Sequence, residues 1–403
     1  MGGLLIDWLE LLVRWTHVIC GIAWIGASFY FIALDASLQP GAALPAGVKG
    51  DAWQVHGGGF YQIQKYMVAP GTMPAHLTWF KWEAYATWIF GFVLLVLVYY
   101  VHPDLYLIDP QVYPLSTSDA VVGGAASLAV GWIVYDLLCR SWFGRDTARL
   151  ATAGFVLLVL ASFAYTHVFS GRGAFIHIGA LVGSIMVGNV FFVIMPNQRI
   201  VVRDLIAGRT PDPKLGAQAK QRSIHNNYLT LPVVFVMISN HYAFTYTGRW
   251  AWLVLACVFI ASFLVRHWFN IGHTGARADW RLWPAAAVPI AAGAALTLIA
   301  QYANTPANAA ANAAAHPTSF AEVQNIVANR CQPCHAASPT WQGISAAPMG
   351  IMLDSPTRIA MLAPRIKTQA VTLRAMPLGN ATGITEVERA ALGDWVDHGA
   401  ATQ

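Results

Sequence analysis

Long apolar segments separated by polar loops are the feature that most restricts how this chain can fold. Eight segments are long enough to cross about 30 Å of hydrocarbon, because a helix rises about 1.5 Å per residue. They comprise residues 8–34, 80–101, 119–139, 150–168, 174–195, 227–246, 250–270 and 281–301. Only 11% of the residues are charged, against roughly 25% in ordinary globular domains. The sequence therefore predicts an all-α, eight-helix transmembrane bundle in a lipid bilayer.

The chain divides into three parts. Residues 1–301 contain the spans, and residues 318–403 are left for a small soluble domain. Between them, residues 302–317 are rich in Ala and Asn with two prolines, a composition that cannot build a core and is typical of a tether. Met1–Glu10 lacks the basic region of a secretory signal, so we expect the first span to remain as an anchor.

The basic residues predict an orientation. The formal net charge is +5, but the Lys and Arg residues lie in short loops and not on one face, so nucleic-acid binding is not expected. With eight spans, both ends of the chain lie on the same side of the membrane. The loops after spans 1, 3, 5 and 7 carry most of the basic residues, whereas the opposite loops carry only Arg172 and Arg249. The positive-inside rule therefore places both termini on the external side.

A short motif in the C-terminal part indicates a cofactor. Cys331-Gln-Pro-Cys334-His335 has the spacing of c-type haem attachment, in which two thiols form thioethers with the porphyrin and the imidazole ligates iron. A structural zinc site is the alternative, but it would need further Cys or His ligands nearby. The remaining cysteines, Cys20, Cys139 and Cys257, lie in apolar segments, where we expect them to pack.

Capping-box patterns predict two helices around this motif. Ser319 with Glu322 begins one helix before the motif, and Thr385 with Glu388 begins the last helix of the chain. This pattern is typical of a small, class I-like cytochrome c domain with one covalent haem. Because c-type haem is attached outside the cytoplasm, the motif and the charge asymmetry both predict a multi-pass bacterial inner-membrane protein with periplasmic termini.

The second axial ligand of the haem iron should be a methionine. Met376 follows the haem motif in a loop, as such a ligand should, and we predict that it ligates the iron together with His335. Met349, Met352 and Met361 are the competing candidates.

Histidines within the spans suggest a second cofactor. Ionisable residues at membrane depth are costly and usually functional. A cytoplasmic electron donor would lie about 30 Å from an external haem, so we predict one or more b-type haems inside the bundle, with His17 as a ligand and His177 or His241 as its partner. For residues near span ends, snorkelling to the interface is the alternative.

Two further segments could bind a planar heterocycle. His225-Asn226-Asn227-Tyr228 offers hydrogen-bond donors and acceptors. Glu83 is surrounded in sequence by Trp79, Trp82 and Trp88, which offer stacking surface, although aromatic residues at a membrane interface have the same composition.

The sequence resembles the bacterial membrane-bound urate oxidases that combine an eight-span urate oxidase domain with a C-terminal cytochrome c. The resemblance covers essentially the whole chain and rests on His17–Gly26, Trp79–Trp88, His225–Pro232 with Ser239–Tyr242, and Arg374–Asn380. It implies a step of purine catabolism, the oxidation of urate to 5-hydroxyisourate. It also implies that electrons pass through haem to the cytochrome domain and on to a soluble cytochrome c or a terminal oxidase of the respiratory chain, and not to oxygen as peroxide.

Urate oxidation requires an anion-binding group, a base and one-electron acceptors used twice. We predict that Arg266 and Asn227 bind the anion and that Glu83 or His225 takes the proton. One competing interpretation is a respiratory relay subunit, a quinol or oxidase-complex cytochrome without urate chemistry. Another is a transporter with an attached redox sensor, for which Pro232 and Pro289 would provide the helix breaks.

Overall fold

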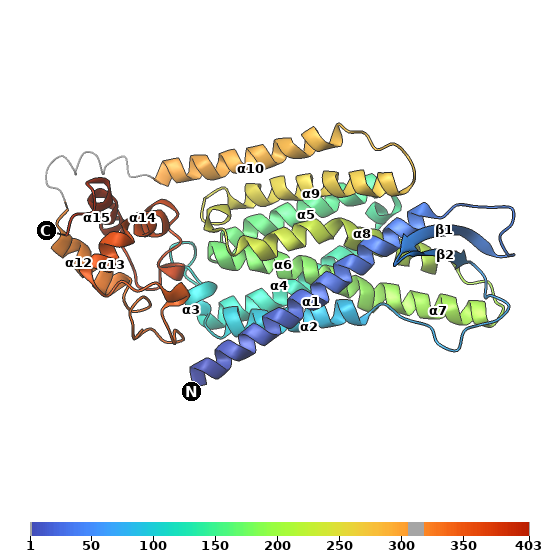
Figure 1. Ribbon diagram of the computed structural model, residues 1–403, viewed down its shortest axis with the longest axis horizontal. Helices are drawn as coiled ribbons and strands as arrows, with labels where there is room; N and C mark the ends of the chain where they lie inside the picture. The colour runs from blue at the N-terminus through green and yellow to red at the C-terminus, as the bar shows by residue number, and fades with distance from the viewer. Residues whose placement is uncertain (1, 305–317, 403) are drawn as a thin grey trace.

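The computed structural model describes residues 2–304 and 318–402, and most of the predicted tether lies outside these residues. Long helices lie side by side and form one elongated bundle, with a small helical domain at one end (Figure 1). The bundle helices are α1 (Gly2–Ser37), α2 (Trp82–Leu95), α4 (Thr117–Arg140), α5 (Thr147–Thr166), α6 (Gly171–Gly188), α7 (Met195–Ile206), α8 (Pro213–Ser239), α9 (Ala251–His273) and α10 (Leu282–Asn304).

Seven described helices are long and apolar enough to cross a membrane, which is compatible with a membrane protein. Helix α8 is not among them because its first half, from Pro213 to His225, is polar. It nevertheless packs against α6 and α9 within the bundle. The predicted count of eight spans requires α8 to cross as well. Helix α1 begins at the same end of the bundle as the C-terminal domain (Figure 1). This arrangement agrees with an even number of crossings.

Two helices of the bundle contain π-helical turns. Helix α2 continues into the turn η1 (Val96–Tyr100), and α6 continues through the turn η3 (Asn189–Ile194) into α7. Such turns insert one residue into a helix and are frequent at functional sites. Helix α6 is the most buried helix of the bundle, and its residues Phe175 and Ile178 have no exposed surface.

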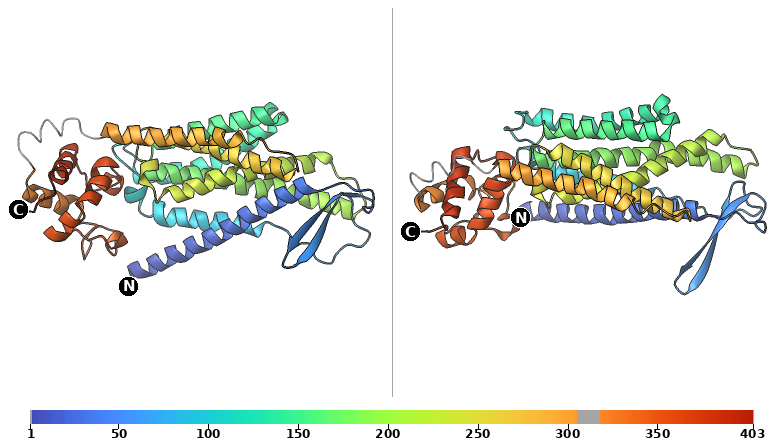
Figure 2. Two further views of the ribbon diagram at one scale, coloured as in Figure 1. Left: turned by 45° about the horizontal axis from the view of Figure 1, so that its top comes forward. Right: turned by 90° about the horizontal axis from the view of Figure 1, so that it is seen from above.

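The all-α prediction missed a β-hairpin. Strands β1 (Val48–His56) and β2 (Gly59–Tyr66) pair antiparallel at the end of the bundle opposite the C-terminal domain (Figure 2). The connecting residues, Gly57 and Gly58, have φ angles of +61° and +80°. Positive φ at both central positions is what a two-residue type I′ turn needs, and glycine adopts it without steric cost. The Gly57-Gly58 pair is the sequence signal for such a hairpin turn. The prediction missed it because the segment lies between two strongly apolar spans, which dominate the pattern.

The C-terminal domain has its own core. Its helices are α12 (Phe320–Arg330), α13 (Pro356–Met361), α14 (Ala363–Ile366) and α15 (Glu386–Asp397). Both predicted N-caps are confirmed, because Ser319 accepts a hydrogen bond from the backbone of Glu322 and Thr385 forms a complete capping box with Glu388. Helices α12 and α15 meet in a core that includes the fully buried residues Val323, Val327 and Leu392.

Asp394 ties the beginning of this domain to its last helix. The side chain is buried, and its Oδ2 accepts hydrogen bonds from the backbone N–H of Thr318 at 2.9 Å and from the Thr318 hydroxyl at 2.8 Å. Burial alone would raise the pKa of the Asp394 carboxyl, but these hydrogen bonds and His398 bring the pKa below its ordinary value.

We expect Asp394→Ala to lower the free energy of unfolding of the C-terminal domain by about 1.5–3 kcal/mol at pH 7, because hydrogen bonds to a charged acceptor are lost. A lowered folded-state pKa stabilises the protein above the unfolded pKa and ceases to do so as the pH falls through the folded pKa. The difference between wild type and variant should therefore shrink below about pH 4. Pulse proteolysis in urea, with thermolysin at pH 7 and pepsin at about pH 3, measures both differences. An equal difference at the two pH values would contradict the assignment.

Candidate functional site

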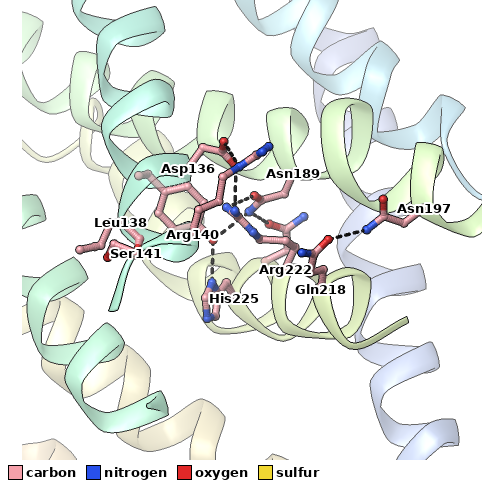
Figure 3. Close-up of polar contacts among 11 residues, drawn as sticks. Asp136, Leu138, Arg140, Ser141, Asn189, Asn197, Gln218, Arg222 and His225 are labelled. Carbon is pink, nitrogen blue, oxygen red and sulfur yellow. Dashed lines mark hydrogen bonds and ion pairs between the residues drawn. The ribbon is translucent and has the colours of Figure 1, made fainter. Parts of the chain in front are cut away.

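Helix α8 carries polar side chains toward two different parts of the bundle. The first group, the Asp136–Arg222 cluster, consists of Tyr135, Asp136, Asn189, Arg222, His225 and Asn226, of which Figure 3 labels Asp136, Asn189, Arg222 and His225. Arg222 Nη2 lies 2.7 Å from Asp136 Oδ1, and Arg222 Nη1 donates to Asn189 Oδ1 at 3.1 Å. Arg140 also pairs with Asp136, at 2.6 Å.

The remaining members of this cluster form hydrogen bonds with one another. Tyr135 Oη and His225 Nδ1 are hydrogen-bonded at 2.6 Å. Asn189, which lies in the π turn η3, donates to Tyr135 Oη at 3.1 Å and to Asn226 Oδ1 at 2.9 Å. Asp136 is a carboxylate partner both for the buried guanidinium of Arg222 and for the exposed Arg140, so the buried positive charge of this cluster is paired within the protein.

The second group, the Arg266 cluster, consists of Asn227, Arg266 and Asn270 between α8 and α9. Arg266 Nε and Asn270 Nδ2 both donate to Asn227 Oδ1, each at 2.9 Å. Asn227 has no exposed surface and Arg266 is 4% exposed. The guanidinium lies 3.8 Å from the centroid of the Phe29 ring. No Asp or Glu of the described residues forms an ion pair with Arg266.

Several buried polar atoms of the Arg266 cluster have no hydrogen-bond partner among the described residues. They are Asn227 Nδ2, Arg266 Nη2 and Asn270 Oδ1. Buried polar groups are normally paired, and an uncompensated buried charge is costly. A cavity of about 450 Å³ adjoins the cluster and is lined by Phe29, Tyr30, Ala33, Leu231, Val265, Arg266, Phe269 and His273. This volume falls in the range of small-molecule sites. Of these residues Arg266 lines the cavity, and its free donor and uncompensated charge indicate a site for a polar anion.

The structure brings together two of the four predicted catalytic residues. Asn227 and Arg266 are in direct contact. His225 belongs to the other cluster, because residues two apart on a helix point about 200° apart. Glu83, at the start of α2, makes no side-chain hydrogen bond or ion pair with any described residue. The sequence interpretation missed Asn270, although its i+4 spacing from Arg266 places it on the same face of α9.

The predicted b-haem ligands do not converge. His17 Nδ1 donates to the carbonyl of Thr87 at 2.8 Å, and its ring packs against Gly91. His177 is fully buried, and both of its ring nitrogens are hydrogen-bonded, to Gly173 O at 2.8 Å and to Tyr100 Oη at 3.0 Å. Gly91 is next to His17 and Tyr100 is next to His177. These two residues are roughly 13 Å apart along one helical run, so the two histidines contact α2 and its continuation at different levels.

His241 follows the end of α8 and is exposed. No hydrogen bond or ring contact of the described residues joins any two of His17, His177 and His241. The b-type haem therefore stays a prediction for which these contacts supply no common iron position.

The side chains of the Cys-X-X-Cys-His motif fit the expected haem. Cys331 and Cys334 are free thiols. His335 Nδ1 donates to the carbonyl of Ile351 at 3.0 Å, which fixes the ring and leaves Nε2 with its lone pair for iron. Among the described residues, no group of three or more His, Cys, Asp or Glu side chains is placed to hold a metal ion.

The surroundings of Met376 also fit. The Met376 carbonyl accepts a hydrogen bond from Arg389 Nη1 at 2.9 Å. Arg374 Nε and Arg389 Nε are buried without a hydrogen-bond partner among the described residues, and guanidinium donors of this kind suit haem carboxylates.

The competing methionines are less suitable as iron ligands. Met349 is 86% exposed and Met361 is 70% exposed. The sulfur of Met352 lies 3.6 Å from Arg358 Nη1. These contacts and exposures favour Met376 over the other three methionines as a residue that could ligate iron.

Comparison with known proteins returns a family that covers the bundle. The sequence model described as "urate oxidase N-terminal" matches residues 3–298. No curated protein and no solved structure gives a match. The matched residues contain both polar clusters and end before the C-terminal domain.

The two arginines should differ in their dependence on a carboxylate partner. Asp136→Ala leaves Arg222 buried without its nearest carboxylate, and we expect it to lower the free energy of unfolding by about 3–5 kcal/mol. Adding Arg222→Met to Asp136→Ala should recover most of that loss. Arg266→Met removes a buried charge that has no partner, so it should leave the stability unchanged or raise it. Thermal unfolding in detergent compares the three variants, and an equal loss in Arg266→Met would show that Arg266 is compensated after all.

Proposed function

The chain belongs to the family of urate oxidase N-terminal domains, and we propose that it oxidises urate to 5-hydroxyisourate in the cavity beside Arg266. The family supports an oxidoreductase that acts on urate. The observation that supports this location is the Arg266 cluster, in which a buried guanidinium lacks a counter-charge and three polar atoms lack partners.

Urate matches the free groups of this cluster. It is a planar anion with N–H and C=O groups along its edges. Arg266 lines the cavity, and the N–H groups of its Nη2 are available for the urate oxygens. Asn227 and Asn270 do not line the cavity but hydrogen-bond to one another, and Asn227 accepts from Arg266 Nε, so they orient the guanidinium. An anion would also supply the charge that Arg266 lacks, and the Phe29 ring, which lines the same cavity, lies 3.8 Å from the guanidinium.

We propose that His273, and not Glu83 or His225, is the base that accepts a proton from urate. Urate and one water give 5-hydroxyisourate, two electrons and two protons, so a base is needed. His273 lines the cavity at the end of α9, and an imidazole can accept a proton and pass it to water. Glu83 and His225 do not line the cavity.

Cys331, Cys334, His335 and Met376 would hold the haem, which would supply a one-electron acceptor. The chain positions these ligands through the Ile351 carbonyl, which orients His335, and through Arg389, which holds the backbone of Met376. The electrons would continue to a soluble cytochrome c or a terminal oxidase. We place the bundle in a bacterial inner membrane with the haem domain on the periplasmic side, supported by the basic loops and by the shared end of both termini.

Substitution of Arg266 should weaken urate binding selectively. We expect Arg266→Met to raise the Kd for urate roughly 10- to 150-fold, which corresponds to about 1.5–3 kcal/mol for charge-assisted hydrogen bonds. Arg249→Met, an exposed arginine before the same helix, should bind like wild type. Calorimetry with urate under anaerobic conditions measures both. If wild type neither binds nor consumes urate while a quinol reduces its haem, the relay interpretation replaces this one.

Substitution of Met376 tests the haem site separately. A methionine ligand raises the reduction potential of haem iron relative to histidine. Met376→His should therefore lower the midpoint potential on the order of 0.1 V, within the roughly 0.8 V that axial ligands control. Met361→His changes an exposed methionine of the same domain and should leave the potential unchanged. Redox titration of the visible spectrum gives the result, and an unchanged potential in Met376→His would exclude Met376 as the ligand.

A further inference from the structure

A short helix, α3 (Pro103–Tyr106), lies where the C-terminal domain meets the bundle (Figures 1 and 2). Gly379 of the C-terminal domain sits directly on this segment. A Cβ atom at Gly379 would lie 2.5 Å from the carbonyl oxygen of Ile108 and 3.1 Å from that of Asp104. A second contact joins Gly343 to the His102 ring, since a Cβ at Gly343 would lie 2.7 Å from its Cε1.

The loop that would supply a haem ligand faces the same segment. Gly379 follows Met376 by three residues, so the loop that carries the proposed iron ligand is the loop that rests on α3. The turn Leu378–Asn380 of this loop packs against α3. The methionine side of the proposed haem site is therefore next to α3.

Tyr106 is held firmly against the bundle. Its carbonyl accepts a hydrogen bond from the Ser170 hydroxyl at 2.7 Å, and the next carbonyl, of Leu107, accepts one from the Ser170 backbone at 2.8 Å. The guanidinium of Arg172 lies 5.4 Å from the centroid of the Tyr106 ring. These contacts fix the ring at the surface that the C-terminal domain covers.

Aromatic rings continue from Tyr106 into the bundle. The Tyr106 and Tyr99 ring centroids are 5.9 Å apart, and those of Tyr99 and His177 are 6.4 Å apart. Tyr99 lies in the π turn η1, and His177 is fully buried. Asn226, the neighbour of Asn227, donates to the carbonyl of Met186, nine residues after His177. The Arg266 cluster is therefore roughly 13 Å from His177 along the bundle.

We propose that Tyr106 is the point at which electrons leave the bundle for the haem of the C-terminal domain, and that Tyr99 and His177 extend this route inward. The proposal rests on the proposed function. Urate would lose its two electrons one at a time, and haem bound in the C-terminal domain would supply the one-electron acceptor for each of them, with reoxidation by the downstream acceptor between the two transfers. The protons remain at the substrate cavity. Rings in near contact shorten the gaps that an electron must cross through unbonded space.

Disturbing the docking contact should slow this transfer without changing the haem. In Gly379→Ala the new Cβ would collide with the Ile108 carbonyl and push the Met376 loop away from α3. Gly383→Ala is a matched control, because its φ of +67° is also left-handed and its nearest atom, Arg330 Nη1, is 3.8 Å away. We expect Gly379→Ala to slow anaerobic haem reduction by urate roughly tenfold or more, since transfer depends steeply on placement. Reduction by ascorbate and the midpoint potential should match those of Gly383→Ala.

Two further readouts separate docking from conduction. Backbone amides of residues 103–108 should exchange hydrogen faster in Gly379→Ala than in Gly383→Ala. Tyr106→Leu, which removes the ring, should slow haem reduction by urate, whereas Tyr106→Phe, which keeps it, should not. If wild type and all four variants reduce haem at one rate with urate, the route through Tyr106 is wrong while the proposed function stands. If wild-type haem does not respond to urate, both fall.

Discussion

Polar groups inside a helical bundle in a bilayer have no water to bind, so each needs a partner in the protein or in a ligand. This constraint separates the two arginines that lie beside α8. Arg222, 3% exposed, has Asp136 and Asn189 as partners, whereas Arg266, 4% exposed, has a neutral amide and an aromatic ring. Two arginines that are equally buried therefore differ in whether the protein itself neutralises their charge. The compensated arginine joins α4, α6 and α8, and the uncompensated one retains the capacity to bind an anion.

The helical irregularities lie where these polar contacts are made. The π turn η3 begins at Asn189, which joins Arg222 to Tyr135 and Asn226. The π turn η1 contains both Tyr99 and Tyr100, which surround His177. An added residue in a helix rotates the side chains that follow it. The bundle thereby directs polar side chains inward at points where regular helices would direct them elsewhere.

The proposed substrate cavity and the proposed haem lie in different parts of the molecule. The cavity lies between α1, α8 and α9, and the haem motif lies beyond the end of the bundle. Such a separation keeps proton release and electron exit apart, so one catalytic residue need not serve both. It also makes the contact of α3 with the Gly379 loop important, because that contact orients the C-terminal domain relative to the bundle.

The sequence by itself determined the features that depend on neighbouring residues. Apolar length predicted the bundle helices, and two capping patterns predicted helix starts. The haem site at Cys331, Cys334 and His335 stays a prediction from spacing. Tertiary structure alone decided which side of α8 each polar residue faces. His225 and Asn227 are two positions apart in sequence yet contact different helices. Tyr135 lies 90 residues from His225, and Arg266 lies 39 residues from Asn227. Only packing brings residues so distant in sequence into contact.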